Sequence, residues 1–302
     1  MPLLTVRHIT TYRYRHPVAF GEHRMMFRPR DSHDQRLLSH KLVISPSPSA
    51  LHWSLDVFGN SVSRAQFSVR NDTLVFDSLL EVDHQEAAPM SVLLADHARM
   101  FPFAYDTDEM PDLARSIERQ LPDPGHVVAR WAHAFLNENG PTQTIELLTR
   151  MTKTICRRFT YRARHEPGIQ DPRTTLRLET GTCRDFAMLM MEAVRALGLA
   201  ARFVSGYLHV PARAHPGEAE RHGGGNTHAW LQVYLPGSGW VDFDPTNGII
   251  GTRGLVRVAV VRDPAMAVPL SGSWTGAAAD CVGMAVTVRV TEDAASSIQV
   301  AS

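Results

Sequence analysis

The sequence predicts a mixed α+β protein, in which an antiparallel β unit precedes a core built from one helix packed on an antiparallel sheet. Short alternating runs separated by turns fill the first third, which is typical of β structure. One amphipathic helical stretch lies in the middle, and two strand patterns joined by a short turn follow it. Because a chain of 302 residues is long for one compact domain, we expect more than one.

We divide the chain by pattern and composition into a β-rich amino-terminal domain (1–85), a linker (86–125), a core (126–250) and a carboxy-terminal β extension (251–302). In the first of these, alternation predicts strands over 4–14, 38–44, 53–58, 62–69 and 73–82. Strands of this length and spacing predict an antiparallel sandwich or an open barrel. The unit contains no acid–base grouping, so we expect a scaffold or docking domain.

Prolines are frequent between 85 and 124, and only one short helix is expected there, over 112–119. Longer helices are predicted from His126 to Leu136 and from Thr142 past Ile155. Cys156 ends the second of these beside two arginines. It has no partner motif, so we interpret it as a structural thiol.

The stretch 179–199 predicts the central helix of the core. Thr182 can cap it, Asp185 three residues later completes a capping-box pattern, and Gly198 lies where the helix should end. The apolar face is formed by residues at helical spacing: Phe186, Met190, Ala193, Val194 and Leu197. Cys183 is therefore the first helical residue, where free N–H groups and the helix dipole stabilise a thiolate. The alternative is a small buried helix residue.

A histidine and an aspartate follow Cys183 in the order that a catalytic relay needs. On the predicted strand 227–235, His228 shares a face with Trp230, Gln232 and Tyr234. On 239–244, Asp242 and Asp244 share a face, and the short turn between the strands predicts a hairpin. Either aspartate could therefore lie beside the histidine.

The long polar loop 211–225 directly before this histidine is a candidate lid or substrate edge. Three histidines in or near the loop have a spacing that fits no metal motif: His209, His215 and His222. We therefore interpret them as solvated loop residues and expect no metal and no cofactor.

The composition excludes some function classes. Basic and acidic residues number 31 each, which argues against bulk electrostatic binding of nucleic acid or an anionic membrane. The three cysteines are too few and too scattered for a disulfide framework or a zinc site. No stretch has the apolar length of a membrane span, and the first residues lack the apolar core of a signal peptide. We therefore expect a cytoplasmic protein.

Two motifs carry a family resemblance: GTCRDFA at 181–187 and THAWLQVYLPGSGWVDFDPTNG at 227–248. In these motifs the chain resembles the transglutaminase-like superfamily, which implies a papain-like core. The pieces YRYRHPV, FRPRD and DVFGN of the first third are similar to the β-rich domain that precedes this core in bacterial members. The resemblance implies that Cys183 is the nucleophile, His228 the base and acid, and Asp244 the orienting carboxylate.

The implied chemistry is cysteine-dependent acyl transfer or hydrolysis at amide bonds of a peptide or protein substrate, through a thioester. The Cys183 N–H and a second, unassigned donor would hold the oxyanion. Hydrolysis, deamidation and cross-linking all remain open, because the outcome depends on whether water or an amine reaches the thioester first. The alternative is a catalytically idle scaffold that binds a peptide, which would be expected to lack one of these three residues.

Overall fold

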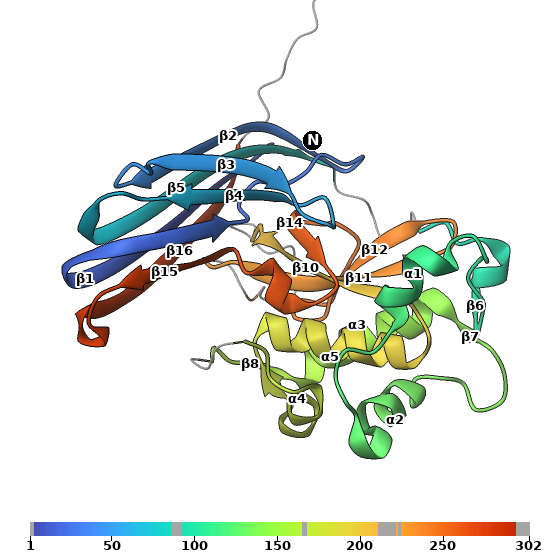
Figure 1. The fold of residues 1–302 in the computed structure, drawn as a ribbon. Helices are drawn as coiled ribbons and strands as arrows, with labels where there is room; N and C mark the ends of the chain where they lie inside the picture. The colour runs from blue at the N-terminus through green and yellow to red at the C-terminus, as the bar shows by residue number, and fades with distance from the viewer. Residues whose placement is uncertain (1–2, 86–91, 165–167, 211–221, 223–224, 294–302) are drawn as a thin grey trace, which may run out of the picture.

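The computed structural model describes residues 3–85, 92–164, 168–210, 222 and 225–293. Within them, a long curled antiparallel sheet lies over a second unit in which a smaller sheet is covered by helices (Figure 1). This confirms the predicted α+β class. The amino-terminal sheet curls into an open half-barrel, which is the second of the two forms predicted for it.

The curled sheet is organised around one very long strand, β1 (Leu3–Met25). The sheet order is β2-β5-β1-β4-β3, and β15 and β16 also pair with β1, so the described residues contribute seven strands. The other members are β2 (Gln35–Ser45), β3 (Ala50–Leu55), β4 (Ser61–Gln66), β5 (Arg70–His84), β15 (Leu270–Thr275) and β16 (Cys281–Asp293). Side chains in the first half of β1 alternate between buried and more exposed, which gives the sheet one apolar face.

The carboxy-terminal segment 251–302 is divided between the two sheets in its described part. Strand β14 (Leu255–Val261) pairs with β10 of the core sheet, whereas β15 and β16 pair with β1. The strong alternation after Cys281 predicts a last strand that begins at Cys281, with this residue in the core. The strand is β16, but the core position was wrong, because Cys281 is exposed. Only the middle of this strand, around Val288, is buried.

The short elements of the middle third are α1 (Met110–Ile117), α2 (Val127–His133), α3 (Thr144–Arg158), α4 (Pro172–Leu178), β6 (Met100–Phe101), β7 (Thr142–Gln143), β8 (Thr160–Tyr161) and β9 (Thr180–Gly181). Single 3-10 turns cover Asp96–Ala98, Pro124–His126, Pro264–Ala267 and Ala278–Asp280. The predicted linker is tied to the core through the Tyr105 hydroxyl. This hydroxyl donates to the Tyr234 carbonyl over 3.0 Å and accepts from the Ala200 N–H over 2.8 Å.

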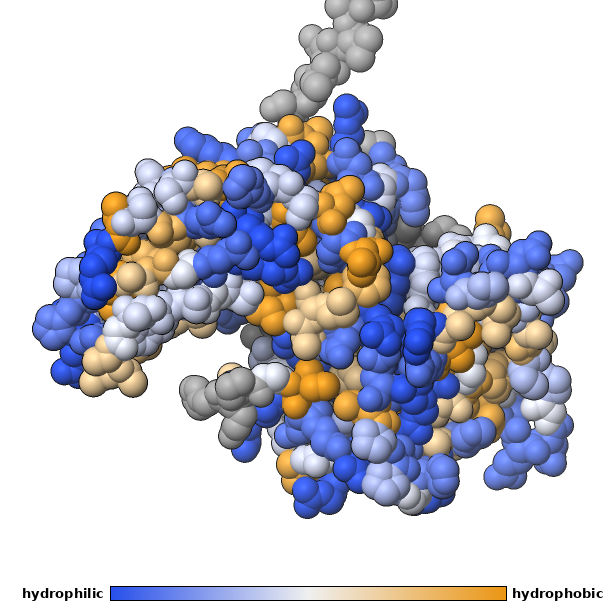
Figure 2. Space-filling view, in the orientation of Figure 1, coloured by the Kyte–Doolittle hydropathy of each residue, from blue (hydrophilic) through white to orange (hydrophobic). Residues whose placement is uncertain are grey.

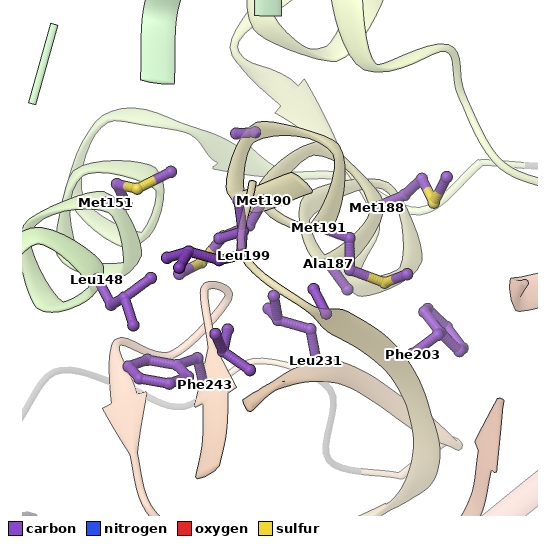
Figure 3. Close-up of a cluster of buried hydrophobic side chains, with 14 of the residues drawn as sticks. Leu148, Met151, Ala187, Met188, Met190, Met191, Leu199, Phe203, Leu231 and Phe243 are labelled. Atoms are coloured by element: carbon purple, nitrogen blue, oxygen red, sulfur yellow. The ribbon is translucent and has the colours of Figure 1, made fainter. Parts of the chain in front are cut away.

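The central helix is α5 (Cys183–Ala196), and it packs on β10 (Ala201–Leu208) and β11 (His228–Leu235). The core sheet has the order β13-β12-β11-β10-β14, with β12 at Gly239–Asp244 and β13 at Ile249–Ile250. Figure 3 shows Met190 and Met191 of the helix above Leu231 and Phe243 of the sheet. Fully burying one such side chain contributes about 1.5–3 kcal/mol. The predicted burial of Phe186, Met190 and Val194 is confirmed.

A second apolar cluster joins the half-barrel to the outer face of the core sheet. Leu4, Val6, Leu80 and Val82 of the half-barrel pack with Tyr207, Val256 and Val258. The Tyr207 hydroxyl and His8 Nδ1 share a hydrogen bond of 2.9 Å inside it. Burial lowers the pKa of His8 to about 4, so this imidazole is neutral at pH 7. The interface thus buries a satisfied polar pair within an apolar contact.

Hydrophilic residues cover most of the face drawn in Figure 2, and apolar residues form small separate patches between them. In the part of the chain that the structure describes, no helix combines the length and the apolar character needed to cross a bilayer.

Candidate functional site

The start of α5 is held by a buried carboxylate. Thr182 has extended dihedral angles and Cys183 is the first residue of the helix. The Asp185 side chain accepts the Thr182 N–H over 2.8 Å, and both of its oxygens accept from the Arg164 guanidinium at 2.8 Å. Burial alone would raise the pKa of Asp185, but Arg164 and the N–H donors hold the pKa below its usual value. This ionised carboxylate fixes the turn that presents Cys183, whose side chain is buried.

His228, the first residue of β11, is bonded to the last residue of β12. Its Nε2 lies 2.8 Å from Asp244 Oδ2, and both side chains are fully buried. Asp244 Oδ1 also accepts the Thr246 N–H over 2.9 Å. Burial alone would lower the pKa of His228, but the charge and hydrogen bond of Asp244, and then Cys183, raise it above its ordinary value. Burial would raise the pKa of Asp244, yet the His228 charge lowers it. The two groups therefore form an imidazolium–carboxylate pair.

The other ring nitrogen of His228, Nδ1, is buried and has no hydrogen-bond partner among the described residues. Cys183 is close enough to act on the imidazole, since its thiol is one of the groups that raise the His228 pKa. His228 thus bonds a carboxylate through Nε2 and lies near enough to a thiol for the thiol to raise its pKa.

Asp242, the other aspartate that the strand pattern left open, belongs to a different network. Its Oδ1 accepts the Trp230 Nε1–H over 2.6 Å, and its Oδ2 accepts from Arg257 Nη1 over 3.0 Å. Arg257 also pairs with Asp34 of the half-barrel. Both oxygens of Asp242 are therefore engaged away from the imidazole, although Trp230 itself stacks on His228 with ring centroids 5.9 Å apart.

Asn247, for which the sequence pattern predicts no role, lies beside the pair. Its Nδ2 donates to Asp244 Oδ2 over 2.7 Å and to the His222 carbonyl over 3.1 Å, and its Oδ1 accepts the His222 N–H over 2.7 Å. The His222 ring stacks on Tyr161, with centroids 5.6 Å apart and planes 3° apart. Asn247 therefore links the carboxylate to the backbone of His222. The available sequence signal was its position in the polar turn directly after β12.

Most of the loop 211–225, proposed above as a lid or substrate edge, lies outside the described residues, and so does His215. His209 is buried, and His222 is bound as just described. Among the residues that the structure describes, no group of three or more potential metal ligands occurs.

Cys156 of α3 lies close to the site without joining it. It is partly buried, and a Cβ added to Gly248 would stand 3.3 Å from its sulfur. Burial and then the negative charge of Asp244 raise the pKa of the Cys156 thiol. A raised pKa lowers its thiolate fraction and hence its nucleophilicity at neutral pH.

The raised pKa of His228 predicts a specific pH dependence of stability. A raised folded-state pKa contributes stability that is complete below the unfolded value, near 6.5, and is lost as pH rises through the folded value. In a Cys183→Ala background, which removes the thiol's own ionisation, we expect His228→Gln to lower the unfolding free energy more at pH 6 than at pH 9. The expected difference is at least about 1 kcal/mol, the equivalent of one pKa unit.

Urea unfolding at pH 6, 7.5 and 9 measures this difference. The matched control is His133→Gln, because His133 is exposed at the end of α2. Equal destabilisation by His228→Gln across the pH range would show that the imidazole does not carry a raised pKa.

Comparison with known proteins gives two family matches and several relatives. The profile of the bacterial transglutaminase-like N-terminal region matches residues 4–83, and that of the transglutaminase-like superfamily matches residues 130–245. An uncharacterized protein of Mycobacterium tuberculosis is 30% identical over 271 residues, covering 88% of this chain and 86% of its own length. One of Mycobacterium leprae is 25% identical over 301 residues, covering 94% and 98%.

Among solved structures, a Cytophaga hutchinsonii protein described as a candidate cysteine protease superimposes with a TM-score of 0.65. The superposition covers 96% of this chain and 90% of that one at 19% sequence identity. At this identity the likeness concerns the fold, and it extends over both the half-barrel and the core.

Proposed function

We propose that this chain, which belongs to the transglutaminase-like superfamily, is an enzyme that transfers or hydrolyses the acyl group of amide bonds through a thioester on Cys183. The observation that carries the proposal is the buried His228, which bonds Asp244 through Nε2 and whose pKa is raised by Asp244 and then by Cys183. A histidine in this arrangement can hold the proton of the thiol while the carboxylate orients the ring and stabilises its charge.

In the proposed mechanism, His228 holds the proton of the Cys183 thiol as an imidazolium, and the sulfur attacks the amide carbonyl carbon as the thiolate. The carbonyl oxygen becomes an oxyanion, for which the N–H of Cys183 at the first position of α5 is the proposed donor. The C–N bond then breaks as the imidazolium donates its proton to the departing nitrogen. The products of this half-reaction are a free amine or ammonia and a thioester on Cys183.

The second half-reaction reverses the roles. Water or an amine gives a proton to His228 and attacks the thioester, and the Cys183 sulfur leaves. Asp244 stays ionised throughout and stabilises the imidazolium that forms in each half. We propose a peptide or protein as the substrate, because the acyl donor must present an amide to a fixed thiol at the edge of the core sheet.

The test is to incubate the full chain with a library of amide-containing peptides and an unmodified protein, with and without a primary amine. Mass spectrometry reads the products: a gain of about 1 Da per site indicates deamidation, a gain of the amine less ammonia indicates transamidation, and shortened peptides indicate hydrolysis. We expect at least one of these with the wild-type chain and none with Cys183→Ala. A wild-type chain that forms none of these products, and traps no thioester with hydroxylamine, would contradict the proposal.

Alkylation gives an independent check that needs no substrate. We expect iodoacetamide to modify Cys183 faster than Cys156, because Cys183 adjoins an imidazolium, whereas burial and then the charge of Asp244 raise the pKa of the Cys156 thiol. Cys281 is exposed and serves as the reference for an accessible thiol outside the site. Peptide mapping at pH 6 and pH 8 measures the three rates. The advantage of Cys183 should be larger at pH 6, and its loss in His228→Gln would tie it to the imidazole. Preferential labelling of Cys156 would oppose this assignment.

A further inference from the structure

A cavity of 430 Å³ lies between the half-barrel and the outer face of the core sheet, away from Cys183. The half-barrel contributes residues 30–34 and Asn60, and the core contributes residues from β10, β11, β12 and β14. A second hollow of 850 Å³ adjoins it and shares Arg202, Trp240 and Val260 with it. Arg202 thus lines both spaces.

The strand register explains how Arg202 comes to lie there. Arg202 on β10 is directly opposite Gln232 on β11, and Tyr234 is opposite Trp240 on β12. The Arg202 Nε donates to Gln232 Oε1 over 2.8 Å, and its guanidinium carbon lies 4.0 Å from the Trp240 ring centroid. Stacking on an indole and bonding through Nε hold the guanidinium plane in one orientation and leave its outer edge open.

The terminal nitrogens of Arg202 form no hydrogen bond or ion pair within the described part of the chain. Arg257, the other arginine deep in the cavity, is by contrast saturated by Asp34 and Asp242. Burial, together with the like charges of Arg257 and Arg30, lowers the pKa of Arg202 to about 9 against the attraction of Asp242. The guanidinium therefore stays charged at neutral pH, but it lacks the paired carboxylate that a buried cation usually has.

We propose that this cavity is a binding site for a carboxylate ligand with a short apolar tail, held by the open edge of Arg202. The guanidinium fork matches the two oxygens of a carboxylate. The tail would lie against apolar side chains that line the same cavity: Val92, Trp240, Val241, Val258 and Val260. A free carboxylic acid and the carboxy-terminal residue of a peptide both combine a carboxylate with an apolar tail, so either could bind.

This site is separate from the proposed active site, although it lies along the same sheet face. Arg202 is paired with Gln232, four positions along β11 from His228, which corresponds to about 13 Å at ~3.3 Å per residue. Asp242 and Arg257 line the cavity, and Asp242 bonds Trp230, the residue of β11 between Gln232 and His228 on this face. Carboxylate binding to Arg202 therefore does not require that Cys183 be catalytic.

Isothermal titration calorimetry of the full chain with sodium hexanoate tests the proposal, at constant ionic strength set with chloride. We expect saturable binding of hexanoate and none of hexanamide, which has the same tail without the charge. Arg202→Gln should weaken binding about tenfold or more, and Arg202→Lys should weaken it less, because lysine keeps the charge but not the fork. The matched control Arg13→Gln removes an exposed arginine on β1 and should bind as the wild type does.

A second arm compares an acetylated tripeptide ending in valine with its carboxy-terminal amide. Binding of the peptide acid but not the amide assigns the site to chain termini, and binding of hexanoate alone assigns it to free acids. Hexanoate should also raise the melting temperature of the wild type and not that of Arg202→Gln, with circular dichroism verifying the fold of each variant. Trp240→Leu keeps the charge and should weaken binding by releasing the guanidinium plane. The proposal is overturned if neither ligand binds, or if Arg202→Gln binds as tightly as the wild type.

Discussion

Replacing Cys183 by alanine is expected to lower the rate of product formation by about 10⁴–10⁶-fold, the range typical of removing a catalytic nucleophile. Alanine cannot form the thioester, so no acyl group can be passed to water or to an amine. The side chain is small and lies at the first position of α5, where alanine is a good helix former. The fold should therefore persist, and single-turnover assays with mass-spectrometric detection measure the loss.

The matched controls are Cys156→Ala and Cys281→Ala. Cys156 lies near Asp244 but is not the proposed nucleophile, and Cys281 is exposed on β16. Both variants should keep the rate within about threefold, as expected of residues that do not touch the reacting atoms. If Cys183→Ala kept its activity and Cys156→Ala lost it, the nucleophile would have to be reassigned to α3.

The second large effect separates the two aspartates of β12. Asp244→Asn should reduce the rate by about 10²–10⁴-fold, because the amide can no longer stabilise the imidazolium and can favour the wrong tautomer. Asp242→Asn should keep the rate within about tenfold, since its oxygens bind Trp230 and Arg257 rather than His228. It should instead cost about 1–3 kcal/mol of stability, because Arg257 loses one of its two buried carboxylate partners.

Rate and unfolding free energy, measured on the same preparations, test this contrast. A third variant, Asn247→Ala, removes the donor that bonds Asp244 and the His222 backbone, and should show a smaller rate loss than Asp244→Asn. A larger rate loss in Asp242→Asn than in Asp244→Asn would transfer the orienting role to Asp242.

The local parts of the site could be predicted from the sequence because their signals are local. The capping residues Thr182 and Asp185 place Cys183 at the first position of α5, and the apolar period predicts its buried face. The role of Asp185 in binding Arg164 could not be predicted in this way, since these residues are 21 positions apart and no spacing rule joins them. The same holds for Tyr161 and His222, which meet only through folding.

The carboxy-terminal strand β16 shows a second limit of prediction from the sequence. Alternation predicted a strand after Cys281, and β16 begins there. Alternation does not specify which part of a strand will be covered, and only the middle of β16 is packed against the core while its first residues extend along the rim of the half-barrel. The exposure of Cys281 follows from this placement.

Four features could be predicted from the residues alone: the α+β class, the helix that begins at Cys183, the hairpin that carries the histidine, and the shared face of Asp242 and Asp244. Helical and strand periodicities and turn chemistry act over a few neighbouring residues, so they can be recognised in the sequence. Which aspartate bonds His228 depends instead on the folded arrangement. With Gln232 opposite Asp242 in the register, His228 and Trp230 each reach an aspartate one diagonal step away, at Asp244 and Asp242 respectively. That choice also depends on Arg257, which lies on β14 of the carboxy-terminal segment and neutralises Asp242. Arg257 in turn pairs with Asp34 of the half-barrel.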